Sequence, residues 1–146
     1  MRQQPGSELS LTATKLIVSK GNLLAHSFHI DWAMAYRKNK ELRAAYNETA
    51  SEELPNNEAM PPSLIAAFIR EEGLMVDEGI GYLKKAIKLR PDYDDAMAYL
   101  NLLYRQKADM EWNREDRDRD LRLADDLVDQ VKKIKEKKMK TRPPER

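Results

Sequence analysis

Cysteine is absent from the 146-residue chain, and glycine and aromatic residues are scarce. The absence of cysteine excludes disulfides, thiolate metal sites and a cysteine nucleophile. With 5 Gly, 7 Pro and 7% aromatic residues, the composition does not suit a large β-sandwich. Net charge is nearly absent as well, since 26 Lys and Arg stand against 25 Asp and Glu. No overall electrostatic field therefore draws this protein to nucleic acid or to an anionic membrane.

Long hydrophobic runs are also missing. The apolar cluster at residues 16–18 is too short for the core of a signal peptide, and no stretch approaches the roughly 18 apolar residues of a membrane span. We therefore expect a soluble, cytoplasmic protein that makes no membrane contact. Charged residues at 35% and hydrophobic residues at 41% are instead typical of a domain built from exposed helices.

The apolar residues of the chain follow a helical period. Apolar residues recur at spacings of three and four in four segments: residues 23–36 with a charged continuation to 48, residues 62–90, residues 94–110 and residues 121–134. The second segment can bend or split at Gly73, and Pro91 ends it. A polar loop with Pro61 and Pro62 at its end is expected between the first two segments.

The third segment is apolar on nearly every side, so neighbouring helices must cover more than one of its faces. It is therefore predicted to be the central helix. The charged stretch 111–120 carries too many alternating charges for burial and is predicted to stay exposed. The predicted packing residues are Leu83, Leu100, Tyr104 and Val128.

Two groups of residues stand at a spacing known from helical repeats. In the third segment they match the pattern W-x2-L-G-x2-Y and are Met97, Leu100, Asn101 and Tyr104. In the second segment they are Gly79, Leu83 and Ala86, followed by Pro91. On these residues the chain resembles the tetratricopeptide repeat family, in its divergent bacterial form.

The resemblance implies an all-α fold, a short tetratricopeptide-like solenoid of antiparallel helix pairs with insertions. Repeat 1 would cover about residues 22–91 with an insertion at 38–62, and repeat 2 would cover about residues 92–138 with extra residues at 111–121. Residues 1–21 would be a disordered segment or the remnant helix of a preceding repeat, and residues 139–146 a basic tail. Fewer than three repeats leaves a fragment of a longer protein or a homodimer as open alternatives.

The resemblance also implies the function, which is non-enzymatic binding of a peptide or protein segment in the concave groove of the repeats. The groove would be lined by the first helix of each pair. By the family's spacing its residues are His26, Ile30, Ala33 and Met34 from the first pair, and Asp95, Ala98, Leu102, Arg105 and Gln106 from the second. An apolar anchor against Ile30, Met34 and Leu102 is the expected mode of binding.

Metal-binding patterns were sought in two places. His26 and His29 lie one helical turn apart with Asp31 nearby, but without a third ligand at a compatible phase they are interpreted as ordinary helix residues, and Asp31 as solvent-facing. The alternating Asp116, Asp118 and Asp120 suggest calcium, yet the glycine and the bidentate glutamate of such a loop are missing. A solvated, salt-bridged helix start is the better interpretation there.

Catalytic motifs are missing from the sequence. It contains no phosphate-binding or dinucleotide-binding glycine pattern, no serine elbow and no zinc-protease motif. We therefore expect no enzyme, no cofactor and no metal.

The alternative function is that of a nucleic-acid-associated helical protein. It would use the cationic end of the chain, Lys132, Lys133, Lys135, Lys137, Lys138, Lys140, Arg142 and Arg146, with the arginines between Arg114 and Arg122. This segment has no aromatic residues to stack on bases, so nucleic acid is not the expected partner.

Overall fold

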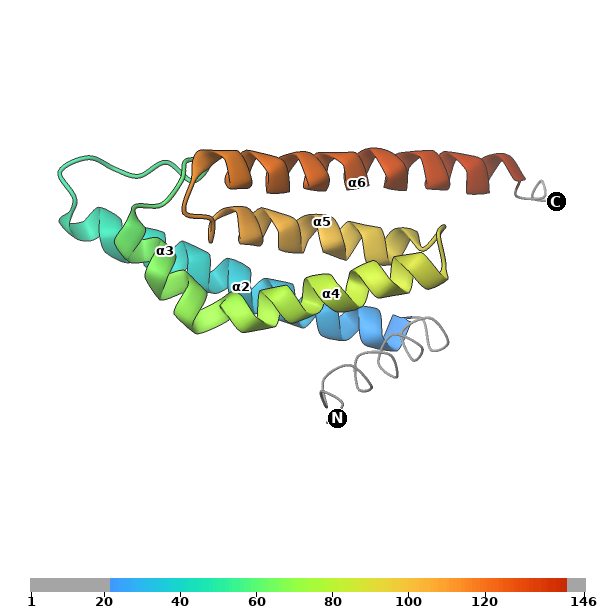
Figure 1. Cartoon of the computed structure of the whole chain (residues 1–146), viewed down its shortest axis with the longest axis horizontal. Helices are drawn as coiled ribbons and strands as arrows, with labels where there is room; N and C mark the ends of the chain where they lie inside the picture. Colours follow the sequence, from blue (N-terminus) through green and yellow to red (C-terminus); the bar gives the residue numbers. More distant parts are fainter. Residues whose placement is uncertain (1–21, 142–146) are drawn as a thin grey trace, which may run out of the picture.

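The computed structural model describes residues 22–141, with side chains described from residue 30 onward, and within that range every regular element is helical (Figure 1). The expected N-terminal segment 1–21 and the end of the basic tail lie outside the described residues. In chain order the elements are α2 (Asn22–Thr49), α3 (Pro62–Phe68), η1 (Ile69–Gly73), α4 (Leu74–Leu89), α5 (Asp94–Ala108) and α6 (Arg114–Thr141). The all-α prediction is confirmed for this part of the chain.

Helix α2 is longer than the apolar period that predicts it. The insertion expected at residues 38–62 is only partly a loop, because residues 38–49 continue the helix and the irregular segment is confined to residues 50–61. Two polar side chains hold this second half of α2 against the rest of the protein: Asn39 and Arg43 are only 6% and 2% exposed. The extension of α2 agrees with the charged continuation to residue 48 that the sequence predicts for the first helical segment.

Helices α3 and α4 form one continuous helical segment, joined by the π-helical turn η1. The helical course is not interrupted, since Phe68, Gly73 and Leu74 keep helical dihedral angles. The segment does bend at η1, where Figure 1 shows α3 and α4 meeting at an angle. A Cβ atom at Gly73 would lie 3.2 Å from Cγ2 of Ile69, so the wide turn leaves little room there. The π-turn places Phe68 and Val76 in the core, each 0% exposed.

Helix α5 is the central helix, as predicted. It packs against α2, α4 and α6, and Figure 1 shows it between α6 and the pair formed by α2 and α4. Of its residues only Asp95 is classed as exposed, while Leu100 and Leu103 are 4% and 1% exposed. The predicted packing residue Leu83 of α4 is also buried, whereas Tyr104 and Val128 are half-buried.

Helix α6 lies antiparallel to α5 and begins earlier than the apolar period indicates. The stretch 111–121, which the repeat spacing treats as extra residues, forms a short turn followed by the first two turns of α6, in agreement with the predicted salt-bridged helix start. The expectation that its charges stay exposed is wrong for Asp120, which is 6% exposed. The helix also continues through Thr141, past the boundary predicted at 138.

Truncating Leu100 to Ala tests this core. The free energy of unfolding should fall by about 2 to 5 kcal/mol, because the lost burial adds to the cavity left among three helices. Chemical denaturation followed by circular dichroism measures the change. The matched control is Leu74→Ala, since Leu74 is 75% exposed and its truncation should change stability little. Equal losses in the two variants would contradict the central position of α5.

Candidate functional site

The predicted groove residues of α2 lie on its outer face. Ile30 and Met34 are 47% and 51% exposed and follow one another at a spacing of four, with the half-buried Ala33 beside them. The opposite side of the helix carries the buried Ala35 and Asn39. Ile30, Ala33 and Met34 therefore form an exposed apolar stripe on α2. The side chain of the predicted groove residue His26 lies outside the described residues.

Four of the five predicted groove residues of α5 lie on one stripe of the helix, and Gln106 is the exception. Asp95 is exposed and Ala98, Leu102 and Arg105 are half-buried. The guanidinium of Arg105 pairs with Asp125 of α6 at 2.8 Å, so this side chain is already engaged.

Gln106 does not belong to an open surface. It is 7% exposed, and its side-chain oxygen accepts a hydrogen bond from Asn39 at 3.1 Å, within the contact between α2 and α5. Its assignment to the groove is corrected on that ground.

A hollow that the sequence did not indicate lies at the end of the helices, between the 50–61 loop and the turn from α5 to α6. Its volume is about 670 Å³. The buried Met60 and Ile65 form its apolar part, and Trp112 at its edge is 62% exposed. The other lining residues are Asn57, Glu58, Ala59, Pro62, Glu111, Asn113, Arg114, Arg117 and Asp118. None of the predicted groove residues lines this hollow.

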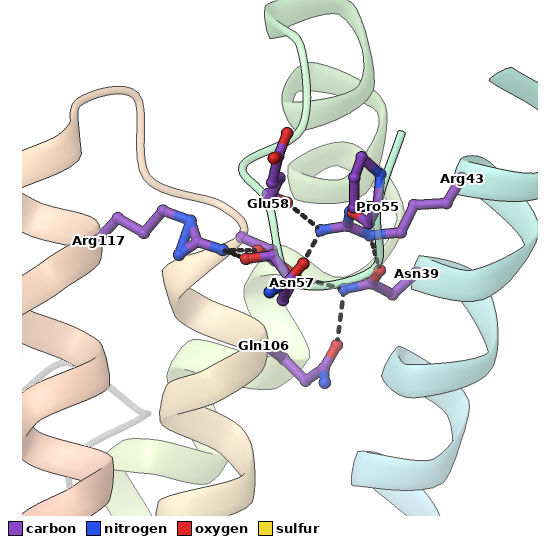
Figure 2. A network of polar contacts seen from close by, with 8 residues as sticks. Asn39, Arg43, Pro55, Asn57, Glu58, Gln106 and Arg117 are labelled. Atoms are coloured by element: carbon purple, nitrogen blue, oxygen red, sulfur yellow. Dashed lines mark hydrogen bonds and ion pairs between the residues drawn. The ribbon is translucent and has the colours of Figure 1, made fainter. Parts of the chain in front are cut away.

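A buried polar network shapes one side of the hollow (Figure 2). Arg43 of α2 donates hydrogen bonds to the carbonyl oxygens of Pro55 and Glu58 at 2.9 and 2.8 Å. The same guanidinium pairs with the carboxylate of Asp109 at 3.1 Å and donates to the side-chain oxygen of Asn39 at 2.8 Å. One side chain of α2 thus holds both the loop and the turn after α5.

Arg117 connects the first turns of α6 to the same network, and Figure 2 shows it reaching the loop from the side opposite Arg43. It donates to the carbonyl oxygen of Asn57 at 3.2 Å and pairs with Asp109 at 3.3 Å. Its Nε is buried and has no hydrogen-bond partner among the described residues. Asp109 therefore joins two arginines from two different helices.

Two carboxyl groups meet where α5 turns into α6. Asp120 is buried, and its Oδ2 has no partner within the described chain. Burial, together with the charge and the side-chain hydrogen bond of Glu111, raises the pKa of Asp120 to about 6, against the opposing charges of Arg119 and Lys107. Asp120 also raises the pKa of the Tyr104 hydroxyl, after the larger effect of that group's own burial. Glu111 is therefore one reason why ionisation of Asp120 is unfavourable in this hairpin.

The acidic residues that suggested calcium do not converge on one point. Asp116 pairs with Arg119 at 3.0 Å and accepts the hydrogen bond of the Asn113 side chain, while Asp118 lies 3.8 Å from Arg114. The salt-bridged helix start is confirmed for these two residues, and Asp120 turns inward instead. No group of three or more potential metal ligands occurs in residues whose side chains the structure describes.

Asp31 is not the solvent-facing residue that the sequence suggested. It is half-buried on α2, and desolvation by burial raises the pKa of its carboxyl group. Glu72 in η1 is 8% exposed, and burial likewise raises the pKa of its carboxyl group, with Lys38 acting in the opposite direction and Asp31 adding to the rise.

Comparisons with protein-family models, with curated proteins and with solved structures each found no match. No helix in the described range 22–141 is long and apolar enough to cross a membrane. The candidate surfaces are therefore defined by their own geometry. They are the apolar stripe of α2, the half-buried stripe of α5, whose Arg105 faces α6, and the hollow beside Trp112, which neither stripe lines.

Replacing Arg43 with Ala tests the polar network. It leaves Asp109 and two loop carbonyls without their buried donor, so the free energy of unfolding should fall by about 3 to 5 kcal/mol. Thermal and chemical denaturation measure this loss, and faster proteolysis within residues 50–61 should accompany it. The control is Arg114→Ala, since the side chain of Arg114 is 92% exposed. A loss no larger than that of the control would show that the network does not hold the loop.

Replacing Asp120 with Asn tests the carboxyl pair. A carboxyl group whose folded-state pKa lies above its unfolded value makes stability fall as pH rises from about 4 to beyond 6. The variant, which cannot ionise there, should therefore melt above the wild type at pH 8 and lose this advantage at pH 4. Melting temperatures across that range measure it. Asp118→Asn is the matched control, and an identical pH profile in wild type and Asp120→Asn would contradict the raised pKa.

Proposed function

We propose that this protein is a non-enzymatic protein-binding module of the tetratricopeptide-like type. The observation that carries the proposal is the uncovered apolar stripe of α2, where Ile30 and Met34 keep about half of their surfaces exposed beside a well-packed core. Exposed apolar side chains that follow one another on a helix are typical of sites for another protein or peptide.

The order of helix contacts supports two stacked hairpins. Lys107 near the end of α5 pairs with Asp77 near the start of α4 at 2.8 Å, so these two helices are antiparallel. Lys138 pairs with Asp94 at 3.0 Å, which makes α6 antiparallel to α5. The hydrogen bond from Asn39 to Gln106 brings the later part of α2 to the end of α5, as in parallel first helices of successive pairs.

The outer face of α6 supports a terminal position in such a stack. Its buried apolar residues Ala124 and Leu127 face α5, and most of its exposed residues are charged, with Leu123 and Met139 as apolar exceptions. A polar outer face is what a solenoid needs at its end, because no further repeat covers it. The open apolar stripe lies at the other end, on α2.

A partner would place an apolar side chain on the stripe of α2, against Ile30 and Met34. Carboxylate capture is not favoured, since the described groove positions Ile30 and Ala98 offer no cation. We expect apolar contact to supply most of the affinity.

Affinity capture from native lysate, followed by identification of the bound proteins, tests this function. The double variant Met34→Glu with Arg105→Glu should lose the proteins that the wild type captures, because charge would enter the apolar stripe and the pairing with Asp125 would break. Lys84→Glu, an exposed change on α4, is the control and should leave capture unchanged. Capture that survives the double variant in folded protein would contradict the proposed groove.

The dependence of binding affinity on salt concentration distinguishes this function from binding to nucleic acid. Most lysines of α6 beyond residue 131 are exposed, and a phosphate-binding surface made of them would lose affinity steeply as salt rises. Binding through the apolar stripe should instead persist at high salt. Nuclease-sensitive capture that also disappears when Lys132, Lys133 and Lys137 are reversed to Glu would favour the alternative.

A further inference from the structure

The hollow beside Trp112 has more acidic than basic groups around it. Its charged lining consists of Glu58, Glu111, Asp118, Arg114 and Arg117. Both arginines already have anionic partners, since Arg117 pairs with Asp109 and Arg114 lies near Asp118. The lining therefore has one more carboxylate than guanidinium, and Glu58 and Glu111 are the two that pair with neither arginine.

The carboxyl group of Asp120 lies next to Glu111 and adds to the negative charge there. Glu111 in turn raises the pKa of the Asp120 carboxyl group, and Oδ2 of Asp120 is buried without a hydrogen-bond partner in the described chain. The nearest cation, Lys107, lies 4.0 Å from Glu111 but 2.8 Å from Asp77, which it pairs with more closely. Two adjacent carboxyl groups thus share part of one cation.

The rest of the hollow suits an apolar group. Met60 and Ile65 are 4% and 5% exposed and form a preformed apolar surface. The ring of Trp112 is largely exposed at the edge, where it can pack against an aliphatic chain or receive a cation over its face. The hollow therefore combines an apolar surface, an accessible aromatic ring and carboxylate charge that is only partly neutralised.

We propose that this hollow binds a peptide segment of a partner protein in which a lysine or arginine stands beside an apolar residue. The cationic group would pair with Glu111, and the apolar side chain would lie on Met60 and Ile65 next to Trp112. The site is separate from the stripe of α2 and α5. The inference rests on the proposed function only in that the ligand belongs to another protein.

Binding at this site should release a proton. The groups that face the carboxyl pair are Tyr104 and Lys107 of α5, Arg119 of α6 and, through Lys107, Asp77 of α4. Below about pH 6 the pair holds a proton that partly replaces a cation, so a ligand cation must displace it. Affinity should therefore increase as pH rises through that region.

Selection from a random peptide library displayed on phage tests the site. Wild-type protein at pH 7.5 should enrich peptides that carry Lys or Arg next to an apolar residue. Synthetic versions of these peptides should bind Glu111→Gln and Trp112→Ala at least about tenfold more weakly. Glu115→Gln is the matched control, because Glu115 is exposed in the first turn of α6, four residues after Glu111, but does not line the hollow. Circular dichroism confirms that each variant is folded.

A second measurement addresses the carboxyl pair itself. The affinity of an enriched peptide for the wild type should rise several-fold between pH 5 and pH 7.5, and Asp120→Asn should bind with little pH dependence over this range. A pH-independent wild type would overturn the inference.

Three selection outcomes would also overturn it: no enrichment, an acidic consensus, or binding unaffected by Glu111→Gln and Trp112→Ala. If the enriched peptides instead depend on Met34, the hollow is not the site, while the proposed function of the α2 and α5 surface stands. If the α2 and α5 surface captures no partner but basic peptides still bind at the hollow, the proposed function is wrong and the inference about the hollow stands.

Discussion

The buried pairing of Arg43 with Asp109 is the interaction on which the shape of this protein's candidate site depends. A guanidinium that is 2% exposed must have its donors satisfied, and here they reach a carboxylate, an amide and two loop carbonyls. Because desolvating a cation is costly, this set of partners is stable only as a whole. It brings the 50–61 loop, the end of α5 and the start of α6 together, and Arg117 completes the arrangement from the other side. The hollow beside Trp112 is the space that these segments leave.

The same end of the molecule holds an unfavourable interaction. Asp120 lies in the contact between α5 and α6 beside Glu111, where an apolar residue would pack without electrostatic cost. The other buried residues on this face of α6, Ala124 and Leu127, are apolar. A binding partner that supplies a cation to Glu111 would relieve the repulsion. In the proposed site the destabilising pair and the ligand preference therefore have one physical origin.

The all-helical architecture could be predicted because its signals are local. The apolar period marks α5 and the later part of α6, Pro62 and Pro91 mark the ends of the second helical segment, and the apolar circumference of α5 indicates its central position. The charged residues 38–48 could also be predicted to continue the first helix, because they include good helix formers, and α2 does extend through them. What the local pattern did not indicate is that charged side chains of these helices, Arg43 and Asp120, are buried.

The sequence by itself determined where the helices lie and that one of them is surrounded, because helix formation and apolar faces depend on residues three and four positions apart. Only the tertiary structure decided which charged residues are buried. Arg43 and Asp109 are 66 residues apart and Arg117 meets a carbonyl 60 residues away, so no local pattern indicates these pairs. Gln106 is buried and Trp112 is exposed, and no local pattern indicates either. The free energy of burying a polar group depends on partners that distant parts of the chain supply.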